Sequence, residues 1–376
     1  MTKKKRKFKI SGTLILNIIV GLLTVYLIFY FCTSENGLLD LLASPDSFNL
    51  IWLIIAVIVY DLNIFIDGVV TLIFIRARFK TFRFFDALKV AFVGIFFGAV
   101  TPSSTGGQPM QLYVLSKMKV DVGFGSACMT QKFIVYQIMT AAFSIFSVIF
   151  DFKFFEQAFT GFWSSAFIIL GLASQMLVTA LLVIVSFSRG ITKKLIQLAS
   201  LIMHKLKFIK NPDGKVERLE KEVDMFHRGN KLLLGNKKLL LVTYILVFFQ
   251  VLTIMSAPYF IYLSFGMPEI AAANNQPVGT FFDFVCIQSF VIFTSNLVPL
   301  PGASGGAELA FTMYFAPFFV FGSIDKIKPA VLLWRFVAYY GTLIISAPFS
   351  YLTKGKKSED KKEAEEVKDI AEVTTA

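Results

Sequence analysis

Six long apolar runs limit what this chain can fold into more than any other feature of its sequence. They cover residues 11–31, 50–75, 122–150, 162–187, 239–265 and 329–352. A helix rises about 1.5 Å per residue, so about 20 apolar residues cross a hydrocarbon core of about 30 Å. Only 16% of the 376 residues are charged and 56% are hydrophobic, which excludes a water-soluble globular domain. The sequence predicts an all-α polytopic membrane protein with six spanning helices.

The basic residues gather on one side of these runs. The N-terminus, residues 188–238 and residues 353–376 together hold most of the 37 Lys and Arg residues, whereas Lys326 and Lys328 are exceptions on the opposite side. Cytoplasmic segments of membrane proteins carry an excess of Lys and Arg, so the N- and C-termini are predicted to be cytoplasmic. The net charge of +12 is therefore a signal of topology, and no nucleic-acid partner is predicted.

Two further apolar stretches are interrupted by proline and glycine. Residues 84–100 precede a break at 101–109 and an arm at 110–115, and residues 281–298 precede a break at 299–306 and an arm at 307–321. Proline removes a backbone donor and glycine frees the backbone, so each break should unwind the helix. Unwound backbone at membrane depth is tolerated only inside protein or beside a wet cavity. The sequence predicts two re-entrant hairpins.

The two breaks share the pattern P-x-x-[ST]-G-G at an offset of 199 residues, as Pro102-Ser-Ser-Thr-Gly-Gly107 and Pro301-Gly-Ala-Ser-Gly-Gly306. Basic residues flank the first hairpin, but loop 266–279 has no Lys or Arg, so the second hairpin should enter from outside. This predicts an inverted-topology repeat whose tips meet near mid-depth. The expected parts are a basic N-terminus (1–10), a first repeat (11–150), a second repeat (162–352) with a cytoplasmic insertion (188–238), and a disordered tail (353–376).

Charged residues inside apolar segments are expensive and are therefore candidates for function. They are Asp61, Asp67, Lys132, Glu308 and Arg335. Asp61 and Asp67 either bind a cationic headgroup or pair with Lys132 and Arg335 as structural ion pairs. Glu308 either lines the same path or caps the helix that follows the second tip. The sequence leaves both alternatives open.

The two tips suit a phosphate group. A helix that starts after each Gly-Gly pair would point unpaired N–H groups and the positive end of its dipole towards the midplane, with hydroxyl groups beside it. The predicted substrate-binding residues of the tips are Pro102, Ser103, Ser104, Thr105, Gly106, Gly107, Gln108, Pro301, Ser304, Gly305 and Gly306.

Two motifs of nucleotide binding and metal catalysis are absent from the sequence. It contains no G-x-x-x-x-G-K-[ST] and no H-E-x-x-H, and no catalytic residue, metal or cofactor is predicted. His204 and His227 lie in the insertion and are expected to be solvated surface residues. The amphipathic residues 195–203 and the charged residues 217–224 predict a pair of helices on the lipid surface. The alternative is a solvated linker helix that contacts nothing.

The tip motifs, the segment 297–308 and a final span with Arg335 resemble the lysylphosphatidylglycerol synthase transmembrane family, which includes the flippase half of the multiple peptide resistance factor. The resemblance covers residues 10–352, and the first tip departs from it at Gln108, where relatives often carry an acidic residue. It implies movement of a phospholipid, phosphatidylglycerol or an aminoacyl derivative, to the outer leaflet of a bacterial plasma membrane. Resistance to cationic peptides would follow.

Two alternatives to a flippase remain. The family label of a phosphatidylglycerol lysyltransferase would require a soluble synthase domain, and the short tail after residue 352 is too small to hold one. We therefore expect the chain to depend on a separate synthase for any lysyl lipid. The second alternative is a membrane scaffold that transports nothing, although a scaffold would not need two broken hairpins.

Overall fold

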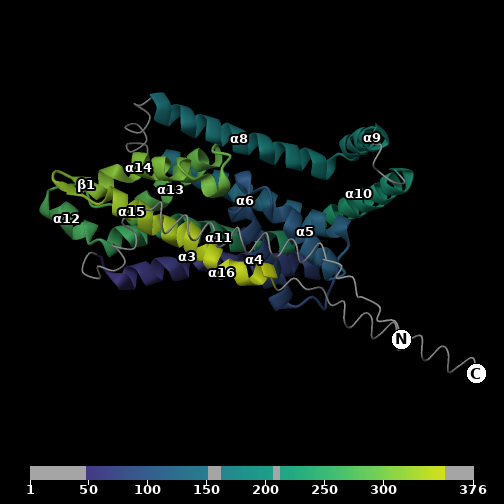
Figure 1. The fold of residues 1–376 in the computed structure, drawn as a ribbon, viewed down its shortest axis with the longest axis horizontal. Helices are drawn as coiled ribbons and strands as arrows, with labels where there is room; N and C mark the ends of the chain where they lie inside the picture. The colour runs from purple at the N-terminus through teal and green to yellow at the C-terminus, as the bar shows by residue number, and fades with distance from the viewer. Residues whose placement is uncertain (1–47, 151–161, 206–211, 352–376) are drawn as a thin grey trace, which may run out of the picture.

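The computed structural model describes residues 48–150, 162–205 and 212–351, and almost all of them are helical. The long helices α3, α8 and α15 with α16 run along the longest axis of the molecule (Figure 1). The helices are α3 (Leu50–Arg76), α4 (Phe84–Ala99), α5 (Gly107–Lys117), α6 (Val122–Phe150), α8 (Phe162–Phe187), α9 (Arg189–Lys205), α10 (Pro212–Gly235), α11 (Lys237–Ser264), α12 (Met267–Ala273), α13 (Phe281–Asn296), α14 (Gly306–Phe319), α15 (Ile327–Arg335) and α16 (Thr342–Tyr351). The predicted first span and the predicted tail lie outside the described residues.

Four described helices are long and apolar enough to cross a membrane. They cover Leu50–Arg76, Ala166–Phe187, Lys237–Ser264 and Ile327–Ser350, and each corresponds to a predicted span. The predicted span 122–150 is one continuous helix, α6, but it is not among these four. Its Gln131, Lys132 and Gln137 are buried in the protein. The spanning of α6 therefore stays a prediction.

Both predicted breaks interrupt a helix. In the first, the short 3₁₀ turn η2 (Pro102–Ser104) joins α4 to α5, and in the second η3 (Pro301–Ala303) joins α13 to α14. Helix α5 begins three residues earlier than the predicted arm at 110–115, because Pro109 stands in its first turn, where a proline is tolerated.

The backbones of the two tips correspond in their first halves at the offset found in the sequence and then differ, because Gly106 is right-handed (φ −78°) whereas Gly305 has φ 85°. Thr101 (φ −114°, ψ 148°) and Leu300 (φ −109°, ψ 154°) are extended, and two residues later Ser103 (φ 50°) and Gly302 (φ 60°) are left-handed. The tertiary contacts also correspond. Helix α16 packs on α4 as α6 packs on α13, and η2 packs against η3. The predicted meeting of the tips is thus observed, whereas their membrane depth and the inverted orientation stay predictions.

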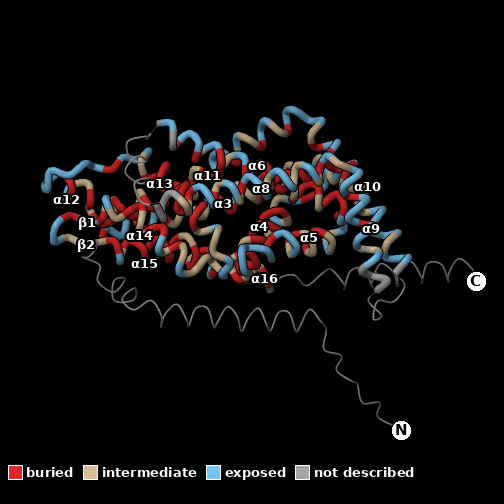
Figure 2. The backbone as a smooth tube through the Cα atoms, turned by 90° about the horizontal axis from the view of Figure 1, so that it is seen from above, coloured by how far each residue is buried: buried red, intermediate tan, exposed pale blue. Residues whose placement is uncertain are grey.

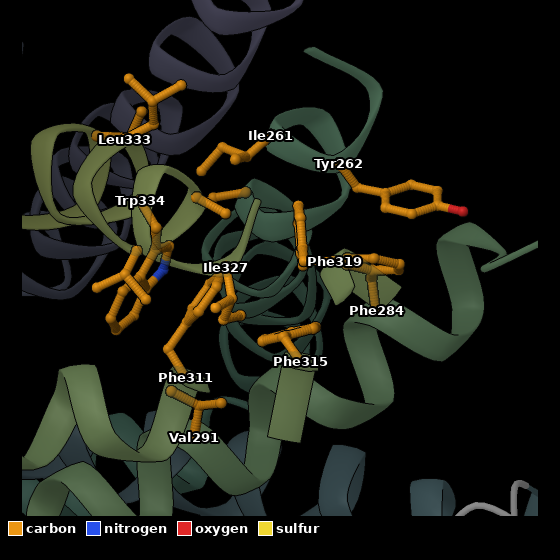
Figure 3. Close-up of a cluster of buried hydrophobic side chains, with 14 of the residues drawn as sticks. Ile261, Tyr262, Phe284, Val291, Phe311, Phe315, Phe319, Ile327, Leu333 and Trp334 are labelled. Carbon is orange, nitrogen blue, oxygen red and sulfur yellow. The ribbon is translucent and has the colours of Figure 1, made fainter. Parts of the chain in front are cut away.

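An aromatic cluster fixes the second hairpin against α15. Figure 3 shows Phe284, Phe311, Phe315 and Trp334 converging from α13, α14 and α15. The ring centroids of Phe284 and Phe315 are 5.1 Å apart, and those of Phe311 and Trp334 are 4.9 Å apart. Such pairs add directional packing to the burial of apolar area. The cluster therefore sets the distance between the two helices that carry Glu308 and Arg335.

Burial and exposure divide the elements clearly. Buried residues concentrate among α4, α13, α14 and α15, whereas α8 and α9 are largely exposed (Figure 2). Two small elements were not predicted. They are α12 and a hairpin in which β1 (Val320–Phe321) pairs antiparallel with β2 (Ile324–Asp325).

The predicted insertion forms α9 and α10, which lie with α5 at one end of the molecule (Figure 1). Helix α10 packs on α6, where the backbone N–H of Gly123 donates to Glu222 Oε2 at 2.6 Å and Gln131 Nε2 donates to Asn230 Oδ1 at 3.1 Å. The alternative of a linker that contacts nothing is therefore wrong. The lipid-surface location stays a prediction, and apolar side chains exposed on α9, such as Leu195 and Leu198, are consistent with it.

His227 corrects a further expectation. Its side chain is not solvated but buried, with Nε2 2.8 Å from Oγ1 of Thr192. The residue was expected at the surface because its neighbours in sequence are charged. Packing of α10 against α9 turns this one position inward, where it joins the two helices.

Acidification should loosen this joint between α9 and α10. Burial and, to a smaller extent, the Arg189 guanidinium lower the pKa of His227, while the Ser186 carbonyl and Asp224 act weakly in the opposite direction. The unfolded segment then binds a proton more readily than the folded one, so the stabilisation is present above about pH 6.5 and is lost as the pH falls below it. The protection factors of the α9 amides, which correct for the slower intrinsic exchange at lower pH, should be smaller at about pH 5.5 than at about pH 7.5. His227→Gln should remove the difference, and equal protection factors of the unmodified chain at both pH values would contradict this prediction.

Candidate functional site

Asp67 and Lys132 form a buried ion pair between α3 and α6. Lys132 Nζ lies 3.0 Å from Asp67 Oδ2, and the two side chains are only 11% and 14% exposed. Lys132 also donates to Thr71 Oγ1 at 3.1 Å, and Gln250 Nε2 from α11 lies 3.5 Å from Asp67 Oδ1. Three helices thus converge on one charge pair. Of the sequence alternatives, the structural pairing of Asp67 with Lys132 is the one observed.

Arg335 contacts several groups of the second tip at once. Its side chain is 4% exposed, and Nε lies 2.8 Å from Glu308 Oε1. The same guanidinium donates to the carbonyl oxygen of Gly302 at 2.9 Å and lies 3.5 Å from Ser304 Oγ. The Tyr339 ring lies beneath it, 4.6 Å from its central carbon. A planar guanidinium makes such simultaneous contacts, whereas a lysine ammonium does not.

Glu308 takes the capping role, one of the two roles that the sequence left open, and it also pairs with Arg335. Its Oε2 accepts the backbone N–H of Gly305 at 2.7 Å, which caps α14, and its Oε1 pairs with Arg335. An acidic residue in the first turn of a helix also stabilises the positive end of the helix dipole. The second tip is therefore held by charge on both sides of its Gly-Gly pair.

Tyr339 links the two tips. Its hydroxyl donates to the carbonyl oxygen of Ala99, the last residue of α4, at 3.1 Å. Its ring also stands against Gly302 in the second tip. The residue lies in η4 (Phe336–Gly341), a π-helical turn between α15 and α16. Single π turns inside α-helices occur frequently at functional sites.

The first tip is held by its own hydroxyls. Thr101 Oγ1 accepts the backbone N–H of Gly106 at 2.8 Å and donates to the carbonyl oxygen of Phe97 at 2.6 Å. Thr105 Oγ1 donates to the carbonyl oxygen of Pro102 at 2.9 Å. Within the described residues, Ser103 and Ser104 have no hydrogen bond to their hydroxyls and are exposed. They are the hydroxyls of this tip that are open to a ligand.

The predicted tip residues differ in exposure. The exposed ones are Pro102, Ser103, Ser104, Thr105, Gln108 and Gly305. The half-buried ones are Gly106, Pro301, Ser304, Gly306 and Glu308, and Gly107 alone of this set is buried. Gln108 therefore points away from the packed part of the tip. The exposed set lies on the surface formed where η2 meets η3.

Asp61 does not join either ion pair. The sequence left open an ion pair between Asp61 and Arg335, and within the described residues none is observed, because Arg335 pairs with Glu308. Asp61 instead has its Oδ1 3.3 Å from Thr342 Oγ1 at the start of α16.

Sequence reasoning missed several residues that hold the site, and some of them carried a local signal. Thr71 and Tyr339 each follow a charged site residue by four positions, the spacing that places two side chains on one helix face. Gln250 is an isolated amide in an apolar run. Thr101 lies within the predicted break, and its partners Phe97 and Gly106 are local. Thr342 could not be chosen from sequence, because its partner Asp61 lies in a distant helix.

Alanine at Gly302 should destabilise the second tip. Gly302 has φ +60°, and an added Cβ would lie 2.4 Å from Cε2 of Tyr339. Gly322 is a matched control, since its φ is +58° and no atom lies within 4 Å of an added Cβ. Left-handed backbone costs either alanine about 1–2 kcal/mol, and overpacking at Gly302 should add at least about 1 kcal/mol. Thermal unfolding in detergent measures the stability of both variants. An equal loss of stability in the two would contradict the prediction, because it would show that the Tyr339 ring moves aside without cost.

Together these features define a class of protein. It is an all-helical membrane protein in which two broken hairpins meet beside a buried arginine. The chain belongs to the family described as lysylphosphatidylglycerol synthase TM region, which it matches over residues 16–346. The resemblance identified from the tip motifs is confirmed by this match.

Two relatives extend the comparison. An uncharacterized protein of Mycoplasma pneumoniae is 24% identical over 251 residues, which is 65% of this chain and 63% of the relative. This chain thus spans less than two thirds of that relative's length. A UPF0104 membrane protein of Archaeoglobus fulgidus is 24% identical over 272 residues, covering 70% of this chain and 75% of the relative. No solved structure matches the chain.

Proposed function

We propose that the chain is a lipid flippase that moves phosphatidylglycerol or an aminoacyl derivative across a bacterial plasma membrane, with both termini in the cytoplasm. The observation that carries this proposal is the packing of tip η2 against tip η3 beside the buried Arg335. Broken helices that meet in this way are typical of transporters, where they form the substrate site. A non-transporting scaffold gives no reason for two unwound tips held by a buried charge.

In this proposal the phosphate of the headgroup binds at the exposed surface where the tips meet. The hydroxyls of Ser103 and Ser104 donate to it, and the helix that begins at Gly107 supplies a favourable dipole end. Arg335 and Glu308 act beneath this surface and hold the second tip in its binding conformation. Asp67 and Lys132 are assigned to the support of α3 against α6.

The biological consequence would be a less negative outer leaflet when the cargo is an aminoacyl lipid. Cationic peptides would then bind the surface less strongly, because their attraction to the membrane is electrostatic. A separate synthase is the partner that would supply such a lipid.

The test uses the purified full chain in vesicles that contain a fluorescent phosphatidylglycerol, with a membrane-impermeant quencher added outside. We expect the chain to expose inner-leaflet label faster than protein-free vesicles do. The double variant Ser103→Ala with Ser104→Ala should slow this exposure about tenfold, since two headgroup donors are lost. Ser116→Ala, whose hydroxyl donates to the Tyr113 carbonyl on α5 away from the tip, is the matched control and should keep the rate.

Two outcomes would overturn the proposal. Exposure of label no faster than in protein-free vesicles would exclude a flippase for this lipid. Formation of lysylphosphatidylglycerol from the chain and lysyl-tRNA alone would instead support the lysyltransferase alternative.

A further inference from the structure

Asp61 is the acid of α3 that the proposed site leaves unused. It lies within a helix long and apolar enough to cross a membrane, and its side chain is half-buried. Asp67 and Glu308 each have a basic partner at 3.0 Å or less. Within the described residues Asp61 has no ion pair, and its one hydrogen-bond partner is Thr342 Oγ1, 3.3 Å from its Oδ1.

The surroundings of Thr342 show which form of Asp61 fits. Thr342 Oγ1 lies 3.3 Å from Asp61 Oδ1 and also 3.3 Å from the carbonyl oxygen of Val337. A threonine hydroxyl has one proton, and both a carbonyl and a carboxylate oxygen only accept. An ionised Asp61 would therefore leave one of the two contacts without a hydrogen. A protonated Asp61 satisfies both, because it donates to Thr342 Oγ1 while Thr342 donates to Val337.

The charged neighbours do not offer Asp61 another way to remain ionised. Tyr60, adjacent on α3, interacts electrostatically with Tyr136 of α6 and with Arg335 at the end of α15. Arg335 itself is paired with Glu308, and Lys132 of α6 is paired with Asp67. Helices α4 and α11 also pack on α3. Their charged residues lie in the first two turns of each helix, and they are Asp86 and Lys89 on α4 and Lys237 and Lys238 on α11. An ionised carboxylate without a partner is expensive at such a place and takes up a proton instead.

The position of Thr342 connects Asp61 to the tips. Val337 belongs to the π turn η4, which begins directly after Arg335 and includes Tyr339. Arg335 contacts the second tip through the Gly302 carbonyl and the Glu308 carboxylate. Tyr339 donates a hydrogen bond to the end of α4, beside the first tip. A change at the Thr342 hydroxyl is therefore transmitted within one helical segment to both tips.

We propose that Asp61 is a proton-binding site that carries its proton in this conformation and that releases it to rearrange η4. On release the proton passes from the carboxyl oxygen to water, and the Thr342 hydroxyl turns from Val337 to the carboxylate. The Val337 carbonyl loses its side-chain donor, so the π turn and the attached Arg335 and Tyr339 change position. This inference deepens the proposed function by adding a proton as a second, coupled ligand. Proton binding at Asp61 does not depend on lipid transport, whereas the coupling of the two rests on the proposed function.

Infrared difference spectroscopy of the full chain in phosphatidylglycerol vesicles tests the proton site directly. We expect a protonated carboxyl band at neutral pH that disappears in Asp61→Asn. The band should persist in the double variant Asp67→Leu with Lys132→Leu, which removes the other acid of α3 together with its partner and serves as the control. Thr342→Val should shift the band because the acid loses its acceptor, and Thr342→Ser should restore it. Absence of the band in the unmodified chain, or its persistence in Asp61→Asn, would overturn the proposal. The Thr342 variants keep the test valid if Asp61→Asn does not fold.

A second measurement separates the coupling from the transport itself. In the fluorescent lipid assay, an imposed pH gradient should change the rate of the unmodified chain several-fold and leave that of Asp61→Asn unchanged. A gradient without effect on the unmodified chain would overturn the coupling. A carboxyl band in a chain that moves no lipid would support the proton site and contradict the proposed function, so the two failures are distinguishable.

Discussion

Arg335→Met should leave the carboxylate of Glu308 without its partner and lower the free energy of unfolding by about 3 kcal/mol. This loss of stability is at the lower end of the range for breaking a buried ion pair. The reason is that the Glu308 side chain is 24% exposed, although that of Arg335 is only 4% exposed. The loss also frees the Gly302 carbonyl, so the second tip should lose its fixed conformation. Lipid exposure in vesicles should fall at least about tenfold, since small displacements of a binding group have large effects.

Two companion variants make the Arg335 prediction specific. Arg335→Lys keeps the charge but not the planar fork, so transport should remain impaired although stability partly returns. Arg228→Met is the control for loss of an arginine, because its side chain is 76% exposed in a pair with Asp224, and it should change stability by less than about 1 kcal/mol. Normal lipid exposure by a folded Arg335→Met protein would exclude Arg335 from the proposed site.

Asp67→Asn should destabilise the chain by about 3–5 kcal/mol, because it leaves the Lys132 ammonium buried without a compensating charge. The double variant Asp67→Leu with Lys132→Leu should recover most of this loss, since apolar side chains of similar size often replace a buried pair without cost. Chemical or thermal unfolding measures both. The exposed pair Lys221 and Glu217 is the control, and its removal should cost less than about 1 kcal/mol.

The same double variant decides between the two roles of this pair. If Asp67 and Lys132 only support α3 against α6, the stable Leu-Leu protein should expose lipid at nearly the original rate. A stable protein with lost activity would place the pair on the path of the headgroup. Recovery of stability is therefore required before the transport result is interpreted.

The sequence predicted the helices and their interruptions well, because these depend on neighbouring residues. Apolar runs fix α3, α8 and α11 through the width of the hydrocarbon core, and proline with glycine fixes the two breaks within a few residues. The capping role of Glu308 could likewise be anticipated, since the capped N–H belongs to Gly305, three residues away. The first predicted span lies outside the described residues and stays a prediction.

The sequence could not choose partners for its charges. The sequence left Asp61 and Asp67 as possible partners of Arg335, yet the guanidinium pairs with Glu308. It also predicted a solvated His227, yet that side chain is buried against Thr192. Each outcome depends on which faces of distant helices come together, and composition near each residue carries no information about this.

By itself, then, the sequence determined an all-helical membrane protein, two unwound tips with a shared register and the residues that could bear charge inside it. Local forces suffice for these, because backbone hydrogen bonding and burial in hydrocarbon act within one segment. Only the tertiary structure decided that Arg335 holds the second tip and that Asp61 reaches Thr342 rather than a basic residue. These contacts join segments far apart in the chain, and their geometry is set by the packing of whole helices against one another.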